Sequence, residues 1–310
     1  MQKLIYIALQ KCKEIIQNYM TNTPLFSVLI ANYNNGRYLQ EAIDSVLAQS
    51  YTNWEVIIVD DGSTDNSSEI YEKYKQDPRF HMYYNEQNMG CGYTKRRCVE
   101  MANGDICGFL DSDDELYPDA ILEMISTHSS NPKVAIVYSR CHECDADKNI
   151  INSNRLLQLK EKETYFDYRW YGAMNFVSFK REKYFLTEGI SSTIKAGVDQ
   201  DLYFKVEEVG DIFVLNKFTY KYIHRSSESI THHSNFAKLW YWNLRVREAT
   251  CIRRNLPIND ILEKDFQFIL DGFEKEIQWE TENKIRKTKT YKIGNLIRNC
   301  AFWRKNKRHY

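Results

Sequence analysis

The sequence lacks the glycine patterns of the common phosphate-binding turns. Glycine supplies only 12 of its 310 residues, no G-x-G-x-x-G follows the first expected strand, and no G-x-x-x-x-G-K-[ST] occurs. The first pattern lets a dinucleotide pyrophosphate approach the backbone, and the second cradles nucleotide phosphates. Their absence argues against a dinucleotide oxidoreductase and against a P-loop protein.

Excess charge of one sign and long apolar runs are missing as well. The 42 lysines and arginines balance 42 aspartates and glutamates, which argues against a general nucleic-acid binder. The apolar run between Leu4 and Leu9 is broken by Lys11 and Lys13 before it reaches membrane-spanning length. We therefore expect a helix over residues 1–24 rather than a signal peptide or an anchor.

Cysteine is present but does not form a ligand pattern. The eight cysteines are scattered, and Cys141 and Cys144 form a C-x-x-C that has no second pair at zinc-ligand spacing. Two structural thiols near a strand end are favoured over a zinc site, and a reducing cytoplasm is the expected setting.

What the sequence does contain is a regular alternation of short apolar runs and amphipathic segments. This alternation predicts an α/β fold with a mostly parallel, doubly wound sheet flanked by helices. The expected strands cover residues 26–34, 54–63, 80–84, 105–110 and 134–138, and the expected helices cover 38–49, 67–75, 93–102 and 119–129. An irregular crossover is expected over 142–163, a further α/β segment over 174–224, and long helices over 236–254 and 258–281.

An acidic loop follows the expected strand at residues 105–110. Asp111, Ser112, Asp113, Asp114 and Glu115 are consecutive there. Clustered carboxylates repel one another unless a cation offsets their charge, and Mg²⁺ or Mn²⁺ binds carboxylate and phosphate oxygens together. The alternative is a solvated loop in which an aspartate caps the next helix.

Two further aspartates end the expected second strand. In a parallel sheet, ligands bind beyond the carboxyl ends of the strands. The carboxylate of Asp60 or Asp61 could accept a hydrogen bond from a nucleotide base. The alternative is a turn or helix cap formed with the following G-S-T-D, and both readings can hold in one loop.

Several ordered motifs resemble glycosyltransferase family 2. They are FSVLIANYN, WEVIIVDDGSTDNS, NMGCGYTKRR and GDICGFLDSDDELYPDAI, with fainter matches in GVDQDLYFKVEEVG and YIHRSSESITH. The resemblance implies an inverting enzyme of GT-A fold that uses a nucleotide-diphospho sugar, with a UDP-sugar as first choice and the base left open. It also implies Mn²⁺ or Mg²⁺ as cofactor and a glycan or lipid-linked acceptor.

The resemblance assigns roles to individual residues by position. Tyr33 would stack on the base, Asp61 would hydrogen-bond it, and Lys95 would lie near base or phosphate. The loop residues Asp111, Ser112 and Asp113 would hold donor and metal. The chain departs from the family pattern in having Ala31 where proline is common, and Lys95 followed by Arg96 where arginine and asparagine are common.

The resemblance also implies an acceptor side. Asp199 matches the family's catalytic base, and Asp201 is the competing position two residues on. A helix N-cap is the alternative role for Asp199. His224 could complete the metal shell or contact the diphosphate, although a lone histidine is more often structural.

The end of the chain concentrates basic residues. From Lys284 to Arg308 there is no acidic residue, and aromatic side chains are interleaved with the cations. Such a segment fits an anionic membrane surface, while a solvated basic tail is the alternative.

The expected organisation is an N-terminal helix at 1–24, a catalytic domain at 25–232 and a helical extension at 233–310. Within the catalytic domain, 25–140 binds the nucleotide sugar and 141–232 faces the acceptor. The expected function is hexosyl or N-acetylhexosaminyl transfer in cell-surface polysaccharide or glycoconjugate synthesis. The competing interpretation is a catalytically silent module that binds nucleotide sugars.

Overall fold

The computed structural model describes residues 23–153, 159–160, 163–167, 176–225 and 236–287. The chain divides into two compact units, Met1–Thr250 and Cys251–Tyr310. The helix expected over 1–24 and most of the basic segment 284–308 lie outside the described residues. Within the described parts of the chain, no helix combines the length and apolarity needed to cross a membrane.

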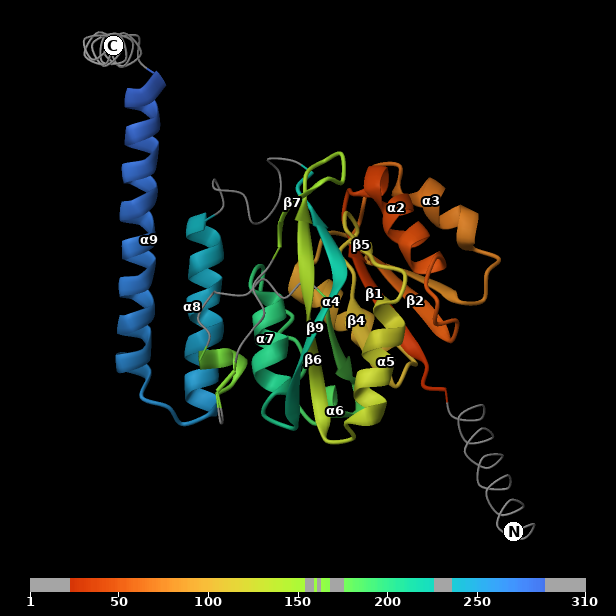
Figure 1. Ribbon diagram of the computed structural model, residues 1–310. Helices are drawn as coiled ribbons and strands as arrows, with labels where there is room; N and C mark the ends of the chain where they lie inside the picture. Colours follow the sequence, from red (N-terminus) through yellow and green to blue (C-terminus); the bar gives the residue numbers. More distant parts are fainter. Residues whose placement is uncertain (1–22, 154–158, 161–162, 168–175, 226–235, 288–310) are drawn as a thin grey trace, which may run out of the picture. The chain divides into compact units, whose positions relative to one another are not determined.

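The first unit is built on one mixed sheet (Figure 1). Its described strands are β1 (Phe26–Asn32), β2 (Trp54–Asp60), β3 (Phe80–Tyr84), β4 (Ile106–Phe109), β5 (Glu115–Leu116), β6 (Val134–Cys144), β7 (Ile150–Ser153), β8 (Val177–Lys180) and β9 (Asp211–Ile223). They lie in the order β3-β2-β1-β4-β8-β6-β9-β5, with β7 paired to β6. The strands β3, β2, β1 and β4 are mutually parallel, as are β6 and β9, whereas β8, β5 and β7 run antiparallel to their neighbours.

The helices follow the strands closely in sequence. They are α2 (Gly36–Leu47), α3 (Ser67–Tyr74), α4 (Cys91–Met101), α5 (Ala120–Ser130), the 3-10 turn η1 (Tyr165–Asp167), α6 (Arg181–Tyr184), α7 (Val198–Val206), α8 (Phe236–Arg253) and α9 (Ile258–Lys287). The alternation predicted from the sequence is therefore confirmed. The last two helices begin at the predicted residues.

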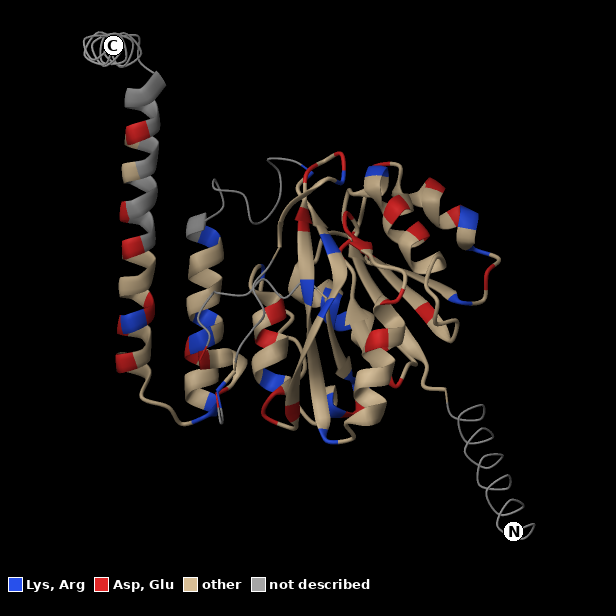
Figure 2. Ribbon diagram, viewed as in Figure 1, with Lys and Arg blue, Asp and Glu red and all other residues tan. Residues whose placement is uncertain are grey.

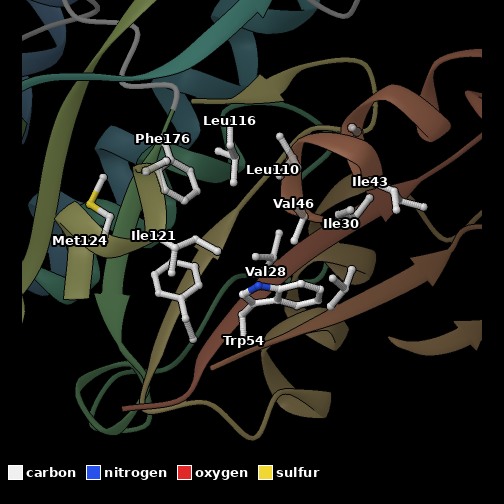
Figure 3. Close-up of a cluster of buried hydrophobic side chains, with 14 of the residues drawn as sticks. Val28, Ile30, Ile43, Val46, Trp54, Leu110, Leu116, Ile121, Met124 and Phe176 are labelled. Atoms are coloured by element: carbon white, nitrogen blue, oxygen red, sulfur yellow. The ribbon is translucent and has the colours of Figure 1, made fainter. Parts of the chain in front are cut away.

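The main core lies between the sheet and the helices α2, α3 and α5. Val28 and Ile30 of β1 pack there with Ile43 and Val46 of α2 and with Ile121 of α5 (Figure 3). Successive side chains of a strand point to opposite faces, and the intervening residue of β1, Leu29, is fully buried too. Both faces of the sheet are therefore covered, and α4 packs against β1 and β2. This explains why the strand sequences are continuously apolar.

The expected crossover over residues 142–163 is partly wrong. Strand β6 continues to Cys144, and β7 pairs with it as a hairpin. The burial pattern explains the error, because β6 is buried on both faces up to Ser139 and then alternates, with Arg140 and His142 partly exposed. The continuous apolar run ends at Tyr138, although the strand continues to Cys144. Cys141 and Cys144 are buried on β6.

Helix α8 packs with the first unit over most of its length. The Arg247 guanidinium stacks on Phe166 of η1 at 4.1 Å and donates a hydrogen bond to the Phe166 carbonyl at 2.9 Å. Both groups are buried. This packing is consistent with a compact first unit that ends at Thr250, and the domain boundary after residue 232 stays a prediction.

A buried polar cluster joins β1, β2 and α3 near the carboxyl ends of the strands. The Tyr71 hydroxyl donates to Asp60 Oδ2 at 2.6 Å, and Asn32 Nδ2 contacts Asp60, Ser67 and Tyr71. Burial and the Asp60 charge raise the pKa of Tyr71 well above its usual value, so this hydroxyl remains a donor. The cluster fixes the strand end from which the next loop begins.

We expect Tyr71→Phe to lower the free energy of unfolding by about 1–3 kcal/mol, because it leaves a buried carboxylate short of one hydrogen bond. The measurement is urea denaturation followed by circular dichroism. Tyr74→Phe, which removes a part-buried hydroxyl bonded to Gln40, is the matched control with the smaller effect. Equal losses in the two variants would contradict the importance of the Asp60 bond.

Candidate functional site

The polar loops predicted from the sequence meet at one edge of the sheet. Because β1, β2 and β4 are parallel neighbours, their carboxyl ends lie together, and the loops that follow them start at Tyr33, Asp61 and Leu110. The acidic residues between β4 and β5 are at this edge (Figure 2). The fold therefore gathers the residues that the sequence singled out.

The loops after β1 and β2 are tied to each other. The Asn34 backbone N–H donates to Ser63 Oγ at 2.9 Å, and the Thr64 N–H donates to Asn34 Oδ1 at 2.8 Å. Tyr33, which precedes Asn34, keeps 49% of its surface exposed. Tyr33 is thus an accessible ring on a fixed backbone, which is the property needed for stacking on a base.

Both aspartates at the end of β2 have structural partners. Asp60 accepts from the Ser63 N–H at 2.8 Å in addition to Tyr71 and Asn32. Asp61 accepts from Asn85 Nδ2 at 2.7 Å and from the backbone N–H groups of Met89 and Gly90 at 2.8 and 2.9 Å. Asp60 therefore makes the turn contact with the residues that follow it, whereas Asp61 bonds the segment before α4. Asp61 in particular fixes the entry to α4, which carries Lys95.

Within the acidic loop, Asp114 is structural. It is buried and accepts from the Tyr220 hydroxyl at 2.8 Å and from the Ile223 N–H at 2.7 Å, both on β9. Burial and the charges of Asp111 and Asp113 raise the pKa of Asp114 well above its usual value. The same Tyr220 hydroxyl accepts from the Asp111 N–H at 3.2 Å. Strand β9 therefore holds the loop at two points.

The remaining loop residues face the site. Ser112 is buried and accepts from Asn35 Nδ2 at 2.9 Å. Asp111 is half exposed, and burial together with the Asp111 charge raises the pKa of Asp113. A cation bound between Asp111 and Asp113 would offset this repulsion.

Lys95 connects this loop to the acceptor side. Its Nζ lies 2.8 Å from Asp199 Oδ1 and 3.3 Å from Asp111 Oδ1, with Lys95 8% exposed and the two carboxylates 48% and 52% exposed. Burial disfavours its charge, but Asp111 and Asp199 outweigh burial and raise the pKa of Lys95 well above its usual value. One nearly buried ammonium thus holds together two carboxylates that are 88 positions apart in sequence.

Asp201 differs from Asp199 although both lie in the first turn of α7. Asp201 is 3% exposed, pairs with Lys205 at 2.9 Å and accepts from the Ser191 N–H at 2.8 Å. A carboxylate engaged in this way holds the chain around it. Asp201 as the alternative base stays a prediction, and it is the less exposed of the two aspartates.

His224 is not gathered with the acidic loop. Its Nε2 lies 3.3 Å from Glu143 Oε2, and its ring meets Tyr222 edge to face. Within the described ranges, no group of three or more histidine, cysteine or acidic side chains is arranged to hold a metal. The described residues thus provide two carboxylates, Asp111 and Asp113, and the role of His224 as a third ligand stays a prediction.

Two important residues carried no clear signal in the sequence, whereas a third, Arg225, lies in the motif YIHRSSESITH. Asn85, after β3, donates to Asp61, and Tyr220 lies within an ordinary β-rich run. Arg225 donates from Nε to the Asp113 carbonyl at 3.2 Å and stacks on Tyr38. Each contact joins segments distant in sequence. Only the position of Asn85 at a strand end could have marked it.

Arg225 also belongs to an ion-pair chain at the rim of the site. Glu41 of α2 pairs with Arg225 and with Lys148 of the β6–β7 hairpin, at 2.5 and 3.3 Å. Lys148 also pairs with Glu115, which pairs in turn with Lys221 at 2.9 Å. This series of ion pairs joins α2, β5, β9 and the β6–β7 hairpin next to the acidic loop. We call these five residues the rim network.

With this geometry established, sequence comparison decides the family. Residues 27–195 match the sequence pattern of the family described as Glycosyl transferase family 2. The chain belongs to glycosyl transferase family 2. The matched segment contains both strand-end loops, Lys95 and the acidic loop, whereas Asp199 lies four residues beyond it.

Individual relatives agree with this family. Chondroitin synthase from Escherichia coli is 33% identical over 236 residues, covering 74% of this chain and 33% of that protein. The chain spans 23–33% of the length of the first three curated relatives it matches.

Solved structures share the GT-A-like fold. S. aureus TarS 1-349 in complex with UDP-GlcNAc superposes with a TM-score of 0.60 at 20% identity, covering 73% of this chain and 66% of that one. The mannosyltransferase PcManGT from Pyrobaculum calidifontis, in complex with GDP-Man and Mn²⁺, gives 0.56 at 14% identity, covering 88% and 83%. At these identities the likeness establishes the fold alone.

The two aspartates of α7 should differ in their effect on stability. Asp201→Asn leaves Lys205 as an uncompensated buried charge, so we expect it to lower the free energy of unfolding by about 3–5 kcal/mol. Asp199→Asn removes a half-exposed carboxylate and should change stability by about 1 kcal/mol or less. Urea unfolding of both variants at neutral pH is the measurement. A larger loss for Asp199→Asn would reverse the assignment.

Proposed function

We propose that the chain is an inverting glycosyltransferase that moves a sugar from a nucleotide-diphospho sugar to a hydroxyl of an acceptor glycan. The observation that carries the proposal is the double ion pair of Lys95 with Asp111 and Asp199. Because both oxygens contact one ammonium, they are no farther apart than the sum of 2.8 and 3.3 Å. Asp111, a carboxylate suited to the donor side, and Asp199, a carboxylate suited to the acceptor side, are thus close to each other.

The donor would bind over the carboxyl ends of β1, β2 and β4. Tyr33 offers an exposed ring for the base, and Asp61 keeps one acceptor position on Oδ2, which receives a single protein hydrogen bond. The diphosphate would then lie toward the acidic loop, where Lys95 and Arg225 provide positive charge. UDP is the preferred nucleotide in this proposal, in keeping with the UDP-GlcNAc complex of the TarS neighbour.

The acidic loop fits a hard divalent cation. Asp111 and Asp113 provide carboxylate oxygens, and the raised pKa of Asp113 records an electrostatic strain that a cation would relieve. We propose that these two residues hold Mn²⁺ or Mg²⁺, as the Mn²⁺ complex of the mannosyltransferase neighbour supports. When bound, the metal would offset the charge of the departing diphosphate.

The chain's own residues would carry out the proton transfer. Asp199 would take the acceptor hydroxyl proton while that oxygen attacks the anomeric carbon opposite the leaving diphosphate, which gives inversion without a covalent intermediate. Lys95 would hold the Asp199 carboxylate in place. The nearby Cys91 does not compete as a nucleophile, because burial raises the pKa of its thiol to about 11.

The acceptor is proposed to be a glycan or lipid-linked glycan in cell-surface polysaccharide synthesis. The chondroitin synthase relative supports a polysaccharide acceptor. We further propose that the enzyme works at the cytoplasmic face of the membrane, with the basic segment 284–308 on anionic lipid. This last point rests on the sequence, since most of that segment lies outside the described residues.

We expect Asp113→Asn to abolish the Mn²⁺-dependent part of UDP binding while the fold is retained. The reason is that Asp113 is a charged group of the acidic loop, without the buried partners of Asp114. Calorimetric titration of UDP with and without Mn²⁺ is the measurement. Asp119→Asn, which makes the same charge change at an exposed carboxylate bonded to Ser50, is the control. Undiminished Mn²⁺ dependence in Asp113→Asn would remove the metal assignment.

The test of the whole proposal is Asp199→Asn in a transfer assay with UDP-sugars and a panel of oligosaccharide acceptors. This variant should bind UDP and Mn²⁺ normally yet transfer sugar at least about 10²-fold more slowly, as expected for loss of a general base. Asp44→Asn, on the exposed face of α2, is the matched control.

Two results would count against the proposal. Full activity of Asp199→Asn would remove the base assignment while leaving the transferase intact. Nucleotide binding by the wild type without transfer to any acceptor would instead favour a silent nucleotide-sugar-binding module.

A further inference from the structure

The loop between α6 and α7 is held through its backbone as well as through the buried side chains of Ile190, Ile194 and Ala196. We define the α6–α7 loop as residues 188–197, which end just before Val198, the first residue of α7. Its exposed side chains include Ser192, Thr193 and Lys195. The carbonyl and N–H groups of the loop, in contrast, are bonded to three helices. Its course is therefore fixed by residues outside it.

Helix α4 binds one side of the loop. Arg96 Nη1 donates to the carbonyls of Ile190 and Glu188 at 3.2 and 3.4 Å. One turn earlier, the Gly92 N–H donates to the Ile194 carbonyl at 3.1 Å. A Cβ at position 92 would lie 2.4 Å from that carbonyl oxygen, so only glycine permits this approach. The loop thus lies directly against the first turns of α4.

The other side of the loop is bound by α6 and α7. Asp201 accepts from the Ser191 N–H at 2.8 Å, and its partner Lys205 donates to the Gly189 carbonyl at 2.8 Å. The Tyr184 hydroxyl accepts from the Ile190 N–H at 3.0 Å. Buried polar groups that are fully bonded in this way resist displacement. The hydrogen bonds therefore couple the position of the loop and of the start of α7 to that of α4.

Helix α4 also carries Lys95, which precedes Arg96 in the sequence. The Lys95 ammonium pairs with Asp199. We propose that Arg96 is a positioning residue that fixes the α6–α7 loop on α4 and thereby sets Asp199 at its place opposite the donor. This inference rests on the proposed function. Lys95 contacts Asp199 through one flexible side chain. Arg96 and Gly92 instead fix the backbone of the loop that precedes Asp199.

The chemistry of arginine suits this task. Its planar guanidinium has five donors in a rigid fork, so one side chain binds two loop carbonyls with Nη1 while Nε pairs with Glu100 at 2.8 Å. An asparagine side chain would be shorter and has only two donors. Lysine has the charge and length but a single donor atom. Arg96→Lys should therefore preserve the function only in part.

The experiment compares Arg96→Ala, Arg96→Lys and the control Glu100→Gln, which removes the exposed ion pair but leaves both carbonyl contacts. Transfer, UDP affinity and thermal stability are measured for each. We expect Arg96→Ala to reduce the kcat of transfer at least about 10-fold, since small misplacements of catalytic groups are costly, with UDP affinity within about twofold of wild type. Arg96→Lys should recover part of that loss, and Glu100→Gln should match the wild type.

A second readout does not need activity. Hydrogen exchange of the backbone N–H groups in the α6–α7 loop and at the start of α7 should accelerate at least about tenfold in Arg96→Ala, while exchange in β1 and β2 stays unchanged. Unchanged kcat, or unchanged exchange in the loop, would overturn the inference. Loss of UDP affinity in proportion to kcat would also overturn it, because Arg96 would then serve donor binding or the general fold. Absence of transfer by the wild type would contradict the proposed function alone, since the exchange experiment still decides the role of Arg96.

Discussion

The architecture of the site depends on the charge of Lys95. A nearly buried ammonium is unfavourable unless carboxylates compensate it, and here two carboxylates do so from opposite halves of the first unit. The attraction brings together a loop after β4 and the first turn of α7, although the chain between them folds into several other elements. The close approach of Asp111 and Asp199 to each other is thus a result of charge balance. The sheet beneath them supplies the fixed edge from which the participating segments start.

Most acidic residues around the site are structural. Asp60, Asp61, Asp114 and Asp201 each accept hydrogen bonds from buried or backbone donors, and each fixes the start or end of a loop. Asp111 and Asp199 differ because about half of their surface is open and their protein partner is the same cation. Exposure and partners, more than residue type, therefore separate Asp111 and Asp199 from the carboxylates that build the frame, of which Asp61 is proposed to contact the base as well.

Much of this could be predicted from the sequence. Apolar runs such as residues 26–32 predict buried strands, and the polar loops must meet because parallel strands end at one edge. The difference between Asp199 and Asp201 could not be predicted, because it depends on Lys205 and on the Ser191 backbone, which reach Asp201 only in the folded chain. The extension of β6 was missed because one face of that strand becomes polar after Ser139. The position of His224 beside Glu143 likewise depends on the parallel pairing of β6 with β9.

The rim network has a consequence for how the site responds to its surroundings. In the Glu41–Lys148 pair both side chains are more than a third exposed, whereas each pair of Lys95 combines a nearly enclosed ammonium with a half-exposed carboxylate. Mobile ions screen exposed pairs far more than enclosed ones, and the screening length shrinks from about 10 Å at 0.1 M salt to about 3 Å at 1 M. Rising ionic strength should therefore loosen the β6–β7 hairpin from α2 first, while the carboxylates around Lys95 keep their spacing. At high salt concentration the rim network would therefore be weakened, while the ion pairs of Lys95 persist.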